Sequence, residues 1–352
     1  MCNSNNSLFL NIDLLRFMPP CRVNRDENNR QKTIMINGGE RLRISSQCIK
    51  AGLRNLFGFN DCVDKEELVT KIKDYKDGDP NESFYLSEDV FNEICGIYTK
   101  EKIDKGSSNV VVYVSLKELK DISSLPKESR TKKENGGLSL LKKENILLTD
   151  DVSLFGRMYA IDSTFKVESA SQVAHAFSIQ DVEITNDNWV CRNSLSDVTH
   201  CTTMNYQGIG SALMYFNANL NISDLIKKKY NKEKIISLVV KFVVGFYTLL
   251  LNSGVSGTAS NTLPVYCHVT VGNKTAYNHS TCFYKPLDHG SSFEDAIELL
   301  KKAIDEDNKL EEGIRSVMTP NVKVEYSSKE FKPTIEEIKQ LKDTLNKLIK
   351  SE

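Results

Sequence analysis

Alternating apolar and polar residues mark the first predicted strand of the chain. Residues 7–14 (SLFLNIDL) place three apolar side chains on one face, and the pair Pro19-Pro20 is expected to end the strand. The polar residues 22–31 that follow predict a loop.

A hairpin and a capped helix are predicted directly after this loop. Residues 33–36 and 40–45 flank an Asn-Gly-Gly turn, and Asn-Gly readily adopts the positive φ that a tight hairpin requires. Ser45 or Ser46 can cap the helix predicted over residues 47–57.

The middle of the chain has a different composition. Charged residues are dense and periodicity is weak from about residue 60 to residue 150, apart from a strand-like VVVYVSL at 110–116, and this predicts an inserted subdomain. Beyond it, the pattern predicts a helix over 170–177, a strand over 179–184 and a polar loop over 185–207.

Strands and helices are mixed, without a fixed repeat, in the last part of the chain. Strands are predicted over 212–220 and 264–271, and helices over 233–251, 291–308 and 333–350. Because strands return after helices and the insertion lies between strands, the predicted fold class is α+β rather than a doubly wound sheet.

Length and composition are those of a soluble globular protein. The 352 residues are 40% hydrophobic and 26% charged, and this length predicts either one large domain with an insertion or two domains. Residues 1–15 have no basic stretch followed by a long apolar one, so we expect no secretory signal. The apolar run 235–251 is interrupted by Lys241 and is too short to cross a bilayer. Nine cysteines without a CxxC pair are typical of free thiols in a reducing compartment. We therefore expect a cytoplasmic protein with no membrane partner.

Signatures of catalysis and of metal or nucleotide binding are weak. No GxxxxGK[ST] or complete GxGxxG motif occurs. Cys267, His268, His279 and Cys282 loosely suggest zinc, but adjacent strand residues face opposite sides, so Cys267 and His268 would not easily share an ion. His175 lies among apolar residues and is expected to be a hydrogen-bonded core histidine. We expect no catalytic set, no metal and no cofactor.

Charge is distributed unevenly, although the whole chain carries a formal net charge of only −1. Between residues 16 and 54 nine basic residues accompany three acidic ones, a net +6 that leaves 37 basic and 44 acidic residues, or −7, elsewhere. The nine are Arg16, Arg22, Arg25, Arg30, Lys32, Arg41, Arg43, Lys50 and Arg54. Interleaved Gly, Ser, Asn and Gln suit phosphate binding, as does the start of the predicted helix. A solvated hairpin with outward arginines explains the same pattern, so composition leaves both interpretations open.

The basic segment also resembles a known family. Residues 23–54, VNRDENNRQKTIMINGGERLRISSQCIKAGLR, are similar to the N-terminal signature of the CasC-type backbone subunit of type I-E CRISPR Cascade. That signature reads LNRDD, a lysine, Gly-Gly and then RxRISSQSLKRAxR. Weaker matches follow in the family's order: LFGRM at 154–158, QVAHAFS at 172–178, SNTLP at 260–264 and FYKPL at 283–287.

The resemblance implies a fold and a function. The fold would be a modified RRM-like, ferredoxin-like palm with an inserted helical fingers subdomain at 59–150 and a thumb loop or hairpin at about 181–212, the palm comprising residues 1–58 and 151–352. Several copies would polymerise into a helical filament along the CRISPR RNA, whose guide pairs with target DNA. The large, small, cap and RNA-processing subunits of Cascade would be further partners. The family subunit is a scaffold that does not cut.

The resemblance also implies roles for single residues. By position, the residues that would hold RNA phosphates and sugars are Arg25, Lys32, Arg41, Arg43, Ser45, Gln47, Lys50 and Arg54. Met158 would pack against bases beside a displaced one, and the thumb wedge would comprise Trp189, Val190 and Cys191. Apolar wedges suit this purpose because a guide must be held without occupying its pairing edges.

The chain departs from the family pattern at several positions. Glu27 replaces the second acid, Cys48 replaces a serine, Ala51 replaces a basic residue, and Val190 replaces a larger wedge. The loop at 253–259 lacks an expected lysine. These departures predict that the chain binds RNA more weakly than the family does, or that its RNA contacts are distributed differently over the residues.

Two alternatives stay open. Backbone subunits of type III complexes cut RNA with an acid in the loop after the first strand, where Asp26 lies in this chain. The sequence places no second acid, His or Lys obviously beside it. The other alternative is a structural protein without an RNA ligand.

Overall fold

The computed structural model of the chain divides into two compact units. The described residues are 7–59, 68–70, 72, 83–87, 111–115, 119–120, 149–157, 166–192, 201–228, 230–251, 258–318 and 325–349. The first unit comprises Met1–Leu53, Val173–Ser223 and Lys232–Glu352, and the second comprises Arg54–Gln172 and Asp224–Asn231. The division at residues 58 and 150 stays a prediction, because most of residues 60–148 lie outside the described part of the chain.

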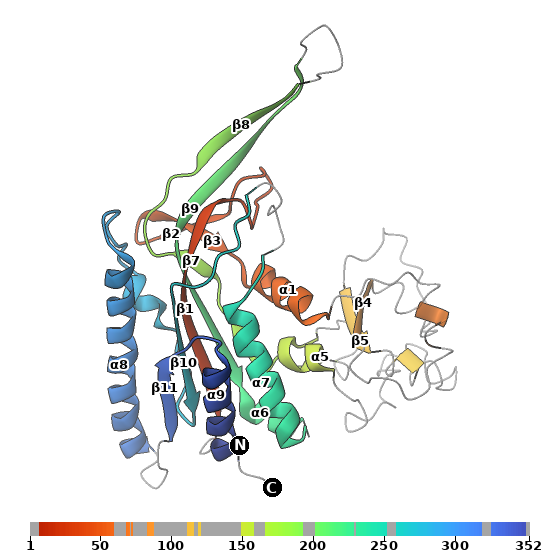
Figure 1. Cartoon of the computed structure of the whole chain (residues 1–352), viewed down its shortest axis with the longest axis vertical. Coiled ribbons are helices and arrows are strands. Elements are labelled where there is room, and N and C mark those ends of the chain that lie inside the picture. Colours follow the sequence, from red (N-terminus) through yellow and green to blue (C-terminus); the bar gives the residue numbers. More distant parts are fainter. Residues whose placement is uncertain are drawn as a thin grey trace, which may run out of the picture. The chain divides into compact units, whose positions relative to one another are not determined.

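An antiparallel sheet is the main element of the first unit (Figure 1). Its strands are β1 (Phe9–Cys21), β2 (Thr33–Ile36), β3 (Gly39–Ile44), β7 (Ala176–Ser178), β8 (Thr185–Arg192), β9 (Cys201–Asn221), β10 (Tyr266–Gly272) and β11 (Tyr326–Glu330). They follow the order β11-β10-β1-β9-β7-β3-β2, and β8 pairs with β9 outside this path. The sheet therefore joins β1, near the start of the chain, to strands about two hundred residues or more later.

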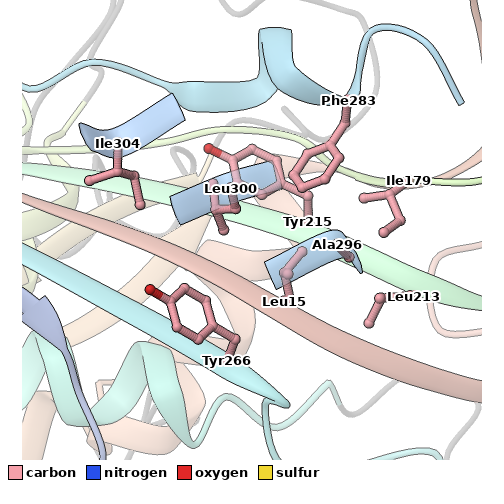
Figure 2. Packing of buried hydrophobic residues seen from close by; sticks show 9 residues of the cluster. All are labelled: Leu15, Ile179, Leu213, Tyr215, Tyr266, Phe283, Ala296, Leu300 and Ile304. Carbon is pink, nitrogen blue, oxygen red and sulfur yellow. The ribbon is translucent and has the colours of Figure 1, made fainter. Parts of the chain in front are cut away.

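Helices cover both faces of this sheet. They are α1 (Ser46–Phe57), which begins in this unit, α7 (Lys232–Tyr247), the 3-10 helix η6 (His279–Phe283), α8 (Phe293–Met318) and α9 (Ile335–Leu348). On one face, Leu15, Tyr215 and Tyr266 pack against Phe283 and the apolar stripe of α8 (Figure 2). On the other face, Arg16 reaches the end of α7, which contacts α9. Helices packed on an antiparallel sheet confirm the predicted α+β class.

The second unit is described only in part. It contains α5 (Asp150–Phe155) and the antiparallel pair of β4 (Ser83–Ser87) and β5 (Val111–Ser115). The strand predicted at 110–116 is therefore confirmed. Two short elements lie where the chain passes between units: β6 (Ser171–Val173) and α6 (Ile222–Lys227). Among the described residues, no helix combines the length and apolarity needed to cross a membrane.

Local signals near the start of the chain are confirmed with one correction. The β2–β3 hairpin turns at Asn37 (φ 51°) and Gly38 (φ 78°), as Asn-Gly predicts. The prediction that Pro19-Pro20 ends the first strand is wrong, because β1 continues to Cys21. Its pairing with β9 shifts register between Met18 and Cys21, and such an irregularity accommodates residues without an N–H.

The predictions for the segment 170–184 are wrong. Residues 171–173 and 176–178 form β6 and β7 rather than a helix, and 179–184 is not a strand. Phe177 pairs with Arg43 on one side and with Tyr215 on the other. Such pairing with distant strands overrides local spacing.

A buried polar cluster lies on the α8 face of the sheet. Asp13 accepts a hydrogen bond from Tyr215 (2.6 Å) and contacts the His279 ring (2.9 Å), whose other nitrogen lies 3.4 Å from Asp307. Burial by itself lowers the pKa of His279, but the hydrogen bonds to Asp13 and Asp307 outweigh it and raise the pKa to about 9. This cationic imidazole thus joins η6 and α8 to β1.

Candidate nucleic-acid interface

The loop between β1 and β2, residues 22–32, is closed by its own acidic residue. The Asp26 carboxylate accepts backbone N–H groups of Asn28 (2.9 Å) and Arg30 (2.8 Å). Asn29 adopts a positive φ of 63°, which asparagine tolerates. The Arg25 guanidinium donates to the Asn29 side chain at 3.2 Å. Both Arg25 and Arg30 are at least partly exposed on this tight turn.

Seven of the nine basic residues are at least partly exposed. We set aside Arg54, whose side chain is only 11% exposed, and call the other six the surface cations. They are Arg22, Arg25, Arg30, Lys32, Arg43 and Lys50. Partial burial and the neighbouring charge of Arg25 both lower the pKa of Arg22, so these two guanidinium groups repel each other. A bound polyanion would relieve this repulsion.

The start of α1 adds further polar groups to the same segment. Ser45 is buried, and its hydroxyl accepts the Cys48 N–H at 3.2 Å, which confirms the predicted helix cap. The Ser45 side chain is therefore engaged in capping, whereas Gln47 is exposed. In this first helical turn, burial raises the pKa of Cys48, and the positive charge of Lys32 opposes that shift. Both the cation and the helix terminus favour an anion there.

His175 belongs to this helix start and not to the core. It is exposed, and its Nδ1 accepts the Ser46 backbone N–H at 2.9 Å. The prediction of a core histidine is therefore wrong, because His175 lies between two short strands, where the neighbouring side chains alternate in direction.

Two of the nine basic residues are buried within the first unit. Arg16 donates to the carbonyls of Leu249 (2.7 Å) and Tyr247 (2.5 Å) at the end of α7, and burial lowers its pKa to about 10. Arg41 is fully buried; it donates to the Ser178 carbonyl at 2.8 Å and forms an ion pair with Asp181 at 2.8 Å. The interpretation of Arg41 as a phosphate ligand therefore needs correction: its guanidinium holds β3 to the chain after β7.

The Arg54 side chain interacts with residues of the second unit. Its Nε lies 2.6 Å from the buried carboxylate of Asp151, and its guanidinium lies over the Phe155 ring at 4.8 Å. Burial raises the pKa of Asp151, and Arg54 opposes that shift. The expectation that Arg54 and Lys50 together face RNA is corrected accordingly, since the Arg54 side chain is only 11% exposed.

The predicted thumb is a long two-stranded hairpin built by β8 and β9 (Figure 1). Its register pairs Thr185 with Ile209 at the root, and Trp189, Val190 and Cys191 with residues 203–205 further along. The three wedge positions thus lie on the outer part of β8. Met158 and residues 193–200 lie outside the described residues.

Sequence reasoning missed the residues that join the loop 22–32 to the root of this hairpin. The Gln31 N–H donates to the Gly208 carbonyl at 3.0 Å, and Arg30 forms a bridge with the same glycine. A Cβ at Gly208 would lie 2.9 Å from Ile184 and 3.0 Å from Arg30. The available signal was a glycine next to a predicted strand, which marks a close backbone approach.

The arrangement suits the binding of an extended polyanion. The surface cations lie on a loop, on strand β3 and on the first half of α1, within one segment that can follow a phosphate backbone. Among the residues that the structure describes, no group of three or more His, Cys, Asp or Glu could hold a metal ion.

Comparisons with known proteins place these observations in a family context. The family model described as "CT1975-like protein" matches residues 10–351. A solved structure titled "CRISPR RNA-guided surveillance complex, pre-nicking" matches with a TM-score of 0.68 and 19% identity, covering 97% of this chain and 100% of the other. Another, titled "CRISPR RNA-guided surveillance complex", matches with a TM-score of 0.57 and 17% identity, covering 97% and 98%. No curated protein matches the chain. At these identities the structural likeness shows the shared fold.

Proposed function

The chain belongs to the CT1975-like protein family, and from this membership we propose that it is an RNA-binding backbone subunit of a CRISPR RNA-guided surveillance complex. The observation that carries the proposal is the position of the surface cations, which lie on the segment joined directly to the root of the β8–β9 hairpin. Cations beside a protruding hairpin suit a protein that holds an RNA backbone and crosses it.

The type of complex and the partners follow from the same proposal. The spacing of the motif at residues 23–54 supports type I-E. Copies of the chain would assemble along a CRISPR RNA together with other Cascade subunits, and the guide would pair with target DNA. The subunit would act in the cytoplasm as a scaffold without a cofactor.

The proposal is tested by purifying the chain together with the products of its neighbouring operon. We expect a high A260/A280 ratio and an RNA of uniform length. A chain that purifies as a nucleic acid-free monomer from a host expressing the array and the partner subunits would favour the structural protein without an RNA ligand.

Replacing surface cations should reduce the salt dependence of RNA binding. For single strands, each cation removed from a phosphate lowers the slope of log affinity against log salt by about 0.7, so Arg25→Gln, Lys32→Gln and Arg43→Gln together should lower it by about 2. The measurement is RNA affinity at several salt concentrations. Lys332→Ala is the matched control, because this lysine is 67% exposed but lies before α9. An unchanged slope in the triple variant would show that these cations are merely solvated.

RNA cleavage through Asp26 is the competing function, because this acid lies in the loop after β1. Its carboxylate accepts two backbone N–H groups, which supports a structural role. We expect the assembled complex to leave labelled complementary RNA intact in Mg²⁺, with Asp26→Ala and Asp26→Asn giving the same result. Periodic cleavage that Asp26→Ala abolishes would replace the scaffold with a nuclease.

A further inference from the structure

Gln31 connects the loop 22–32 to two strands: its buried side chain reaches β3, and its backbone N–H reaches β9. The residue is 3% exposed, and its Nε2 donates to the Arg43 carbonyl of β3 at 3.0 Å. Its Oε1 accepts the Asn24 N–H at 3.2 Å, and its own N–H donates to the Gly208 carbonyl on β9. Few rotamers satisfy an amide with these partners, so the side chain is tightly constrained.

Asn24 extends this connection to the helix. Its side-chain oxygen accepts the Ser45 N–H at 2.9 Å, and its carbonyl accepts the Lys32 N–H at 2.8 Å. Ser45 is the cap of α1, so the loop is fixed to the helix start as well as to β3.

The hairpin side of the connection depends on close backbone approach. Gly208 lies opposite Asn186 near the root of the β8–β9 hairpin. The aliphatic part of Arg30 occupies the space where a side chain at Gly208 would stand. The hairpin root and the loop therefore cannot move apart without breaking these contacts.

We propose that Gln31 is a positioning residue whose buried amide fixes where the β8–β9 hairpin crosses bound RNA relative to the surface cations of the same subunit. The proposal rests on the proposed RNA-binding function. It adds a residue that determines the position of the hairpin on the RNA rather than the affinity for RNA. Gln31 is buried and need not touch RNA itself. Loosening it leaves every surface cation in place while the hairpin root gains freedom relative to β3 and α1.

The experiment uses complexes assembled on one RNA of defined length and probes base displacement with dimethyl sulfate. The variants are Gln31→Leu, which removes the amide at similar volume, and Gly208→Ala, which crowds the other side of the contact. Matched controls are Gln180→Leu, whose amide donates to the Asp288 carbonyl at 3.3 Å, and Gly290→Ala, where an added Cβ meets nothing within 4 Å. For both variants we expect an unchanged salt slope and loss of the regular reactivity interval, whereas both controls keep it.

The outcomes separate this proposal from the function beneath it. If the wild-type chain binds no RNA, the proposed function itself fails. If the wild-type complex shows a regular interval and both variants keep it at the same sharpness, Gln31 has no positioning role. Should Gln31→Leu fail to fold, Gly208→Ala decides: a regular interval in that variant overturns the proposal, and its loss with an intact melting temperature supports it.

Discussion

Arg41→Ala is expected to destabilise the protein strongly, although a basic residue in this segment would ordinarily be assigned to RNA. The substitution removes a fully buried guanidinium that forms an ion pair with Asp181 and donates to the carbonyls of Ser178 and Tyr284. Breaking a buried ion pair costs about 3–5 kcal/mol, and we expect about 3 kcal/mol here because Asp181 can be hydrated once its partner is gone. The measurement is the free energy of unfolding in denaturant.

Arg43 provides the matched control for Arg41. It lies two residues further along β3, on the same face of the strand, but is only half-buried. Arg43→Ala should keep most of the stability and lower the salt slope of RNA binding, and Arg41→Lys should restore only part of the stability that Arg41→Ala removes. Full stability of Arg41→Ala together with a reduced salt slope would show that the guanidinium faces RNA.

This contrast shows what the sequence could and could not predict about the site. The hairpin, the helix cap and the charged segment follow from neighbouring residues, and Asn37, Gly38 and Ser45 behave as their local chemistry requires. The structural role of Arg41 depends on its partners Ser178, which is 137 positions away in the chain, and Asp181, which follows soon after Ser178. Two arginines two residues apart on one strand look identical until the distant partner is known.

Strand pairing is the second reason why parts of the fold could not be predicted from the sequence. Residues 170–177 have apolar spacing compatible with a helix, and only their pairing with β3 and β9 makes them strands. Among the described residues, β8 pairs with β9 alone, so both faces of the hairpin can remain polar. Alternation is then weak, and residues 185–207 could be predicted only as a polar loop.

The polar connections of the loop 22–32 were likewise beyond the sequence. In the sequence, Asn24 and Gln31 look like ordinary polar loop residues. Their role comes from hydrogen bonds with backbone groups of β3, α1 and β9, which only the folded chain brings near. Gly208 and Gly210 form a GxG in the sequence, which is only the first part of the dinucleotide-binding GxGxxG motif. In the structure, the missing side chain of Gly208 makes room for Arg30. The glycine thus marks a close approach of another part of the backbone, as glycine in a strand often does, and not a nucleotide-binding site.

Shortening the β8–β9 hairpin should abolish regular assembly while leaving a folded subunit. The change replaces residues 189–205 with an Asn-Gly turn between Asn188 and Tyr206, which already face each other in the hairpin register. The part of β9 that pairs with β1 is retained, so we expect the melting temperature to stay close to that of the wild type. The surface cations also remain, so short RNA should bind with an unchanged salt slope.

Failure of assembly is expected because the removed arm carries the predicted wedge. Unstacking a base costs a few kcal/mol, and contacts between neighbouring subunits must offset that cost. Without the arm, nuclease digestion of a long RNA should give no regular protected interval. In the full-length chain, Val190→Phe should be tolerated, because the resemblance at the sequence level predicts a larger apolar wedge at this position. A shortened hairpin that still assembles with the wild-type protection interval would mean that residues 189–205 do not form the thumb, and the interval would then have to come from another contact between subunits.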